Sequence, residues 1–146
     1  MNYYITLLGS YPYQSKKIKA LKKEPKLYFW DWSEVPSLSA RLENMVASHL
    51  LKFCDYLYDS FGEKVKLFYI RDVDKREVDF LVTYKNQPWF AVEVKRSETH
   101  IDRSIKYFKE KLAIPFCYQV VGDTEEDYTK DGIRVIPLSK FLALLV

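Results

Sequence analysis

Glycine is scarce in this chain. Only four of the 146 residues are glycine, and they stand far apart at Gly9, Gly62, Gly122 and Gly132. The phosphate-binding loops of P-loop ATPases and of dinucleotide-binding folds need several glycines within a few residues. Neither loop can be found here, so we expect no ATP site in this chain.

Cysteines and long apolar runs are also scarce. Cys54 and Cys117 lie far apart in apolar contexts, without the spacing of a zinc site or of a small disulfide scaffold. The apolar run near the N-terminus is too short to cross a bilayer and lacks the basic lead of a signal peptide. We therefore expect a reduced, cytoplasmic protein without a membrane span.

Apolar and aromatic residues are abundant, at 48% and 16% of the chain, which predicts a globular protein with one main core. The formal net charge is +3, and six lysines stand against one acid between residues 16 and 26. Such a segment is either a solvated stretch or a contact for phosphates, as in DNA. The candidate phosphate contacts are Lys16, Lys17, Lys19, Lys22 and Lys23.

Hydrophobic periodicity predicts the order strand, helix, three strands, helix, strand, strand, helix. The three consecutive strands follow a long helix that starts at Ser37 or Ser39, so they are expected to form an antiparallel meander in a mixed α/β sheet. An apolar patch at residues 5–8 has no predicted partner. The predicted elements are strand 26–32, a helix from 37 or 39, strands 65–72, 77–84 and 89–96, helix 100–112, strands 116–121 and 133–137, and helix 138–146.

Three charged residues lie inside strands that otherwise look buried. Asp79 belongs to the second strand of the meander, and Glu93 and Lys95 belong to the third. The alternation of side chains in a strand places Asp79 on the face opposite Val78 and Phe80, and it places Glu93 and Lys95 side by side. In the preceding helix, Glu43 lies at the edge of the apolar stripe, where its carboxylate can face inward.

The register between these two strands decides whether the charges meet. Pairing Tyr84 with Trp89 would put Asp79 opposite Val94, so Asp79 can meet Glu93 only if an odd-length loop or a bulge shifts the pairing by one residue. Carboxylates that meet repel one another unless a cation lies between them, and oxygen ligands suit Mg²⁺ or Mn²⁺.

A neighbouring lysine could then help to orient or deprotonate an attacking water, as phosphodiester hydrolysis requires. The alternative interpretation is that Glu93 and Lys95 form an ordinary ion pair on an exposed strand, with Asp79 as a turn carboxylate.

The segments KLYFWDW, RLENMVASHLL, LFYIRDVDKREVDFLV, AVEVKRS and GIRVIPLSKFL follow one another in this order. In this order they resemble the C-terminal nuclease-like domain of unknown function in a family of prokaryotic AAA-type ATPases. The helix, meander, helix and strand are similar to the PD-(D/E)xK nuclease superfamily, which has the restriction-endonuclease-like fold.

The resemblance implies roles for five residues. Asp79 and Glu93 would bind Mg²⁺ or Mn²⁺, Lys95 would be the catalytic lysine, and Glu43 would be the supporting acid of the first helix. Arg71 matches a recurrent arginine of the family, with a role as a phosphate or carboxylate contact.

The resemblance also implies a division of the chain. Residues 1–26 would be the incomplete end of an upstream winged-helix and ATPase region, and residues 27–146 would form the nuclease-like domain. Val78 stands where the motif of the superfamily's name has proline. The second helix lacks the glutamine that many active members have, and Arg103 or Lys106 is either a substitute phosphate contact or part of a solvated face.

Three functions remain open from the sequence. The first is a metal-dependent phosphodiesterase of the nuclease type that acts on DNA. The second is a catalytically silent interaction or regulatory domain of the ATPase, in which the apolar ends at residues 5–8 and 141–146 contact the ATPase module or a second copy of the chain. The third is a nucleic-acid-binding module that does not cleave.

Overall fold

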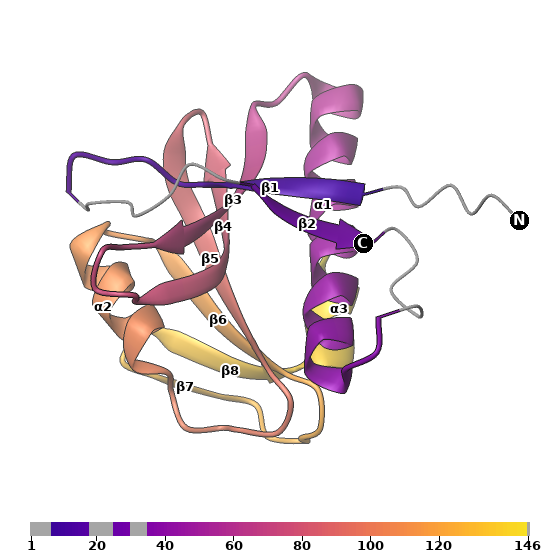
Figure 1. The fold of residues 1–146 in the computed structure, drawn as a ribbon, viewed down its shortest axis with the longest axis vertical. Coiled ribbons are helices and arrows are strands. Elements are labelled where there is room, and N and C mark those ends of the chain that lie inside the picture. Colours follow the sequence, from indigo (N-terminus) through magenta and orange to yellow (C-terminus); the bar gives the residue numbers. More distant parts are fainter. Residues whose placement is uncertain (1–6, 18–24, 30–34, 146) are drawn as a thin grey trace, which may run out of the picture.

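The computed structural model describes residues 7–17, 25–29 and 35–145. The strands in these ranges are β1 (Leu7–Pro12), β2 (Lys26–Phe29), β3 (Val65–Arg71), β4 (Glu77–Tyr84), β5 (Gln87–Lys95), β6 (Phe116–Val121), β7 (Tyr128–Lys130) and β8 (Ile133–Pro137). They form one eight-stranded mixed sheet in the order β2-β1-β3-β4-β5-β6-β8-β7 (Figure 1). This confirms the predicted mixed α/β sheet.

Three helices cover the two faces of the sheet. Helices α1 (Leu38–Phe61) and α3 (Leu138–Leu144) lie on one side, and α2 (Arg103–Lys111) lies on the other (Figure 1). Two separate apolar clusters fill the layers: Leu50 packs with Phe80 on the α1 side, and Phe108 packs among the residues on the α2 side. None of the helices in the described ranges is long and apolar enough to cross a membrane.

The connections follow the predicted meander. Strands β3, β4 and β5 pair antiparallel in sequence order, and α2 then carries the chain to β6, which pairs with β5 in parallel. Strand β8 continues the parallel part beside β6. The sheet therefore changes from antiparallel to parallel pairing at β5, and the predicted site residues Glu93 and Lys95 lie on this strand.

Two strands were not predicted. Strand β1 pairs with β2 and with β3, and Leu7 and Leu8 lie opposite Phe29 and Tyr28, so the prediction that this patch has no partner is wrong for these two residues. Residues 5 and 6 lie outside the described part of the chain. Strand β7 has only three residues, all exposed, and therefore shows no hydrophobic pattern.

The C-terminal segment is less exposed than predicted. Phe141 in α3 has only 2% of its surface exposed and belongs to the cluster on the α1 side of the sheet. The prediction that residues 141–146 form a bare contact surface is wrong for this residue. Leu144, three residues later, is 55% exposed.

Of the two serines predicted to cap α1, Ser37 is the one at the N-cap position. Ser37 has an extended backbone, and its Oγ accepts a hydrogen bond from the Ala40 N–H at 3.1 Å. Ser39 lies inside the helix and is exposed. The helix ends at Gly62, whose φ of 69° is a conformation that glycine adopts without strain.

We expect the Ser37→Ala substitution to lower the free energy of unfolding by about 1 kcal/mol, because it leaves a backbone N–H at the helix start without its acceptor. Ser39→Ala is the matched control and should change stability by less than about 0.5 kcal/mol. Urea denaturation followed by circular dichroism measures both. Equal effects of the two substitutions would show that Ser37 is not the cap.

Candidate metal and catalytic site

The register of β4 against β5 contains the one-residue shift that the site requires. Tyr84 pairs with Gln87, and one residue is then skipped on β5, so that Val82 pairs with Phe90. The skipped residue is Trp89, which is therefore a β-bulge. The shift brings Phe80 opposite Val92, and the next positions on the two strands are Asp79 and Glu93.

Strands β4 and β5 separate directly after the Phe80–Val92 pair, and we call this place the fork. Beyond that pair, Glu77 and Val78 of β4 still pair with β3, and Glu93 to Lys95 of β5 still pair with β6. The side chains of Asp79 and Glu93 bridge the fork through backbone groups of the opposite strand. The Val94 N–H donates to Asp79 Oδ2 at 2.8 Å, and the Asp79 N–H donates to Glu93 Oε2 at 3.3 Å.

A second bulge lies on the other side of β4. Between the pairs Phe68–Leu81 and Ile70–Val78, one residue of β3 faces two residues of β4, Asp79 and Phe80. Because of this bulge, Val78 packs on the α2 side of the sheet while Phe80 packs on the α1 side. The prediction that Val78 and Phe80 share a face is therefore wrong.

The two carboxyl groups at the fork are costly to ionise together. Burial and the negative charge of Glu43 raise the pKa of Asp79, although the hydrogen bond from the Val94 N–H opposes this. Burial and the charge of Asp79 raise the pKa of Glu93, whose side chain is only 8% exposed. Lys26 lowers the pKa of Asp79 and Lys95 lowers that of Glu93, but burial and the neighbouring carboxylates outweigh these cations.

Glu43 extends from α1 toward the same region but is held by other partners. Its Oε1 accepts a hydrogen bond from the hydroxyl of Tyr28 at 3.0 Å and lies 3.7 Å from Nζ of Lys26. Burial, and then the charge of Glu43, raises the pKa of Tyr28, so this hydroxyl remains a donor. Lys26 and Glu43 also line a hollow of about 320 Å³ between β2 and α1.

Lys95 lies on the predicted strand, but its ammonium group is engaged away from the fork. Its Nζ is 3.0 Å from Asp102 Oδ2 and 4.0 Å from Glu98 Oε2. Asp102 is also the N-cap of α2, where its Oδ1 accepts from the Ser104 N–H at 2.8 Å. Burial lowers the pKa of Lys95, but Asp102 outweighs this effect and the pKa is raised. Lys95 is thus a charged group bound to a helix cap.

Gln119 on β6 supports this arrangement and was not predicted. It is fully buried, and its register partner on β5 is Glu93. Its Nε2 donates to the carbonyl groups of Glu98 and His100, and its Oε1 accepts from the Asp102 N–H at 2.9 Å. The only signal in the sequence is a polar residue within the apolar run FCYQVV.

The predicted phosphate contacts are only partly described. Lys16 and Lys17 are exposed, whereas Lys19, Lys22 and Lys23 lie outside the described residues. Nε of Arg71 lies 3.7 Å from Glu77 Oε2, too long for a hydrogen bond but close enough for attraction. On α2, Arg103 and Lys106 are exposed, and Lys106 forms an ion pair with Asp131 at 2.9 Å.

The donor set at the fork consists of two carboxylates. Within residues 7–17, 25–29 and 35–145, no group of three or more His, Cys, Asp or Glu side chains is arranged to hold a metal ion. Asp79 and Glu93 nevertheless fit a hard divalent cation, because Mg²⁺ commonly takes one or two protein carboxylates and keeps water as its other ligands. Burial and the repulsion between carboxylates raise the pKa of both groups, and a bound cation would oppose both effects.

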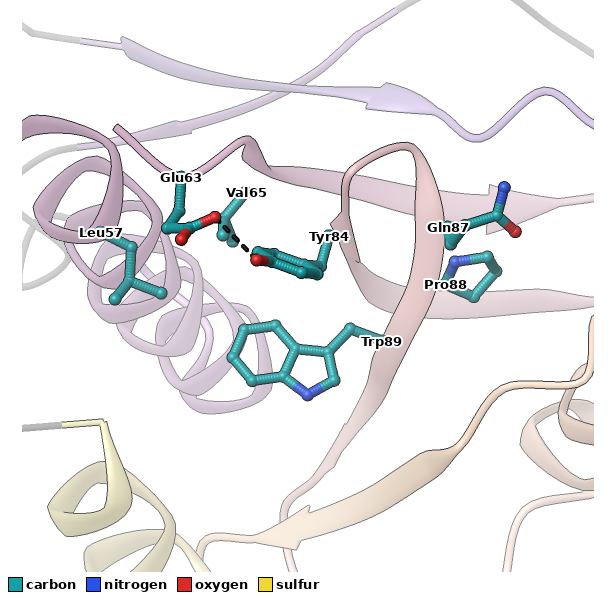
Figure 2. Close-up of a pocket in the computed structure, with 7 residues that line it drawn as sticks. All are labelled: Leu57, Glu63, Val65, Tyr84, Gln87, Pro88 and Trp89. Carbon is teal, nitrogen blue, oxygen red and sulfur yellow. Dashed lines mark hydrogen bonds between the residues drawn. The ribbon is translucent and has the colours of Figure 1, made fainter. Parts of the chain in front are cut away.

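A larger hollow than the one beside Glu43 lies elsewhere on the described surface. It has a volume of about 460 Å³ and lies between the end of α1 and the β4–β5 hairpin. Figure 2 shows its apolar lining around Leu57 and Trp89, with the hydroxyl of Tyr84 donating to Glu63 Oε2 at 2.7 Å. None of the fork carboxylates lines it, so it is not part of the candidate site.

We expect the stability of the metal-free protein to depend on the ionisation of Glu93. Its raised pKa means that the folded protein holds the proton more tightly than the unfolded chain does. The free energy of unfolding therefore falls as the pH rises above the ordinary glutamate pKa of 4.5. Glu93→Gln cannot ionise, so its stability should increasingly exceed that of the wild type between about pH 5 and about pH 8.

Urea denaturation in the presence of a chelator measures this difference. Glu125→Gln, at an exposed position, is the control and should follow the wild type at every pH. A Glu93→Gln curve parallel to that of the wild type would contradict the prediction.

Gln119→Leu should lower the free energy of unfolding by about 3 kcal/mol, because it leaves the Asp102 N–H and two carbonyl groups without partners. Gln14→Leu, at an exposed site, should change it by less than about 0.5 kcal/mol. Chemical denaturation measures the free energy of unfolding of both variants. If both variants were equally stable, the loop before α2 would not depend on this amide.

Comparisons with known proteins extend these observations to the level of the family. No curated protein and no solved structure matches the chain. Residues 39–141 match the family model of a domain of unknown function, DUF4143. The matched range runs from the start of α1 into α3 and contains Glu43, Asp79, Glu93 and Lys95. Because it covers more than half of the 146 residues, the chain belongs to the DUF4143 family.

Proposed function

We propose that this domain is a metal-dependent phosphodiesterase of the nuclease type that acts on DNA, with Asp79 and Glu93 as the ligands of Mg²⁺ or Mn²⁺. One observation carries the proposal: the two carboxyl groups meet at the fork, each bound to an N–H of the opposite strand. Each carboxyl group has a second oxygen with which it could bind a cation.

The charge around the fork supports a divalent ion. We define the acidic cluster as Glu43, Glu77, Asp79 and Glu93. Among the described residues, the side-chain cations in contact with it are Lys26 and Arg71, while Lys95 is matched by Asp102. When all are ionised, four carboxylates against two cations leave two negative charges, which is the charge that one divalent ion supplies.

The order of the elements supports a restriction-endonuclease-like core. Helix α1, the meander β3–β4–β5, helix α2 and the parallel strand β6 follow one another as the resemblance implies. Domains of the DUF4143 family are typically found in proteins associated with AAA-type ATPases, in agreement with the more specific resemblance. A fold of this kind also serves non-catalytic roles, so the function depends on the site.

The roles of the chain's own residues follow from their positions. A divalent cation, when bound, polarises the phosphodiester and lowers the pKa of water. Asp79 and Glu93 would hold that ion at the end of two paired strands, where their backbone is fixed. Exposed Lys16 and Lys17 would contact the DNA backbone, a contact that weakens with salt. Glu43, bound to Tyr28, would remain a supporting acid beside the ion.

The proposal predicts that the wild type binds Mn²⁺ and cleaves DNA, and that Asp79→Asn and Glu93→Gln abolish both. Calorimetry with MnCl₂ measures binding, and plasmid and single-stranded DNA report cleavage. Glu125→Gln, which removes an exposed carboxylate, is the control and should retain both Mn²⁺ binding and DNA cleavage. Cleavage that survives Asp79→Asn would show that another site, or a contaminant, is responsible.

The second candidate is a catalytically silent nuclease-fold domain that serves as an interaction or regulatory module. The observation that favours it is the pairing of Lys95 with Asp102, which holds the predicted catalytic lysine at a helix cap. Absence of Mn²⁺ binding by the wild type at millimolar metal would support this candidate. DNA binding that weakens with salt, without cleavage, would instead identify a nucleic-acid-binding module.

A further inference from the structure

A lysine outside the predicted site lies within the acidic cluster. The ammonium group of Lys26 donates a hydrogen bond to Glu77 Oε1 and lies 3.7 Å from Glu43 Oε1. Its positive charge also acts on Asp79, whose pKa it lowers. Lys26 therefore contacts the cluster from β2, a strand outside the range that matches the family model.

Four elements form the surroundings of this ammonium group. Glu43 comes from α1, Glu77 from β4, and the ring of Tyr69 on β3 lies 4.9 Å from Nζ. Tyr28, two residues after Lys26 on β2, donates its hydroxyl to the same Glu43 oxygen. Alternate residues of a strand point to the same face, so β2 provides both a cation and a hydroxyl to Glu43.

The ammonium group of Lys26 remains charged in this environment. Burial lowers its pKa, but the hydrogen bond to Glu77 and the charges of Glu43, Glu77 and Asp79 outweigh burial and raise it. Lys26 is therefore not a proton acceptor near neutral pH. It is a fixed positive charge, and its side chain is 26% exposed.

The two lysines near the fork thus have different partners. Lys95 binds Asp102 at the start of α2, whereas Lys26 binds two members of the acidic cluster. In an acidic site, an ammonium group and a metal ion are alternative sources of positive charge. A group already paired with Lys26 is less available to a metal, and the ammonium repels any ion that binds beside it.

We propose that Lys26 is the built-in cation of the acidic cluster, where its ammonium neutralises Glu43 and Glu77 in place of a second metal ion and sets how tightly a divalent ion binds at Asp79 and Glu93. This inference rests on the proposed function for the ion at Asp79 and Glu93, and adds to it a residue that limits metal affinity.

The experiment measures Mn²⁺ binding by calorimetry in the wild type and in Lys26→Met, which removes the charge and keeps the length of the side chain. We expect Lys26→Met to bind Mn²⁺ about tenfold more tightly, because one repulsive charge near a divalent ion is lost and two carboxylates are released. Lys26→Arg keeps the charge and should bind as the wild type does. Lys140→Met removes a surface lysine paired with Asp127 and should also leave the affinity unchanged.

Lys26→Met leaves Glu77 without its hydrogen-bonded cation and could fail to fold. A second comparison, of Glu77→Gln with the double variant Lys26→Met/Glu77→Gln, covers this case. Residue 77 carries no charge in either variant, so loss of the ammonium leaves no unpaired carboxylate there. The double variant should bind Mn²⁺ more tightly than Glu77→Gln alone. Asp79→Asn in each background shows whether the added affinity belongs to the fork.

The outcomes separate the two proposals. If the wild type binds Mn²⁺ and Lys26→Met binds no more tightly, the role of Lys26 is refuted while the proposed metal site stands. If only Lys26→Met binds, Lys26 blocks the site, and the proposed activity fails for the wild type. If neither binds at millimolar metal and the double variant behaves likewise, both proposals are overturned.

Discussion

The structure depends on how the chain provides hydrogen-bond acceptors for the backbone N–H groups at the fork between β4 and β5. Where two paired strands separate, their facing N–H groups lose the carbonyl acceptors of the ladder, and buried N–H groups without partners are costly. Asp79 and Glu93 supply those acceptors reciprocally, each to the opposite strand. Strand β5 pairs with β6 from Phe90 to Lys95, so beyond the fork it continues against β6 alone.

The same arrangement explains why carboxylates occupy these positions although they are expensive to bury. A serine or asparagine could also accept a backbone hydrogen bond, without the repulsion that raises the pKa of both Asp79 and Glu93. Structural need alone accounts for acceptors at the fork but not for two ionisable groups side by side. The presence of two ionisable groups, rather than neutral acceptors, is therefore what the proposed cation site explains.

Much of the architecture could be predicted because its signals are local. The alternation in residues 77–84 and 116–121 predicted β4 and β6 with their observed bounds, and the helical stripe with a cap at Ser37 or Ser39 predicted α1. Strands β1 and β7 were missed for physical reasons. Strand β1 contains Gly9, Ser10 and Pro12, which favour turns, and it becomes a strand by pairing with β2 and β3.

The site was predictable only in part. Period-two geometry showed that Asp79 and Glu93 could meet if the register shifted by one residue, and the bulge at Trp89 provides that shift. The second bulge, which moves Val78 to the other face, has no signal in the sequence because it arises from the pairing of β3 with β4. The contacts of Lys26 and Gln119 could not be predicted, since each residue acquires its partners from elements distant in sequence.

The bulge at Trp89 links the apolar hollow at the hairpin to the fork. It turns the indole toward the α1 side, where Trp89 packs against Phe53 and lines the apolar hollow of Figure 2. It also sets the register between β4 and β5 that brings Asp79 and Glu93 together. If the pairing of Tyr84 with Gln87 continued without the bulge, Asp79 would lie opposite Val92 rather than Glu93. The bulge that places this aromatic side chain near the hairpin thus also sets the register of the charged groups at the other end of the strands.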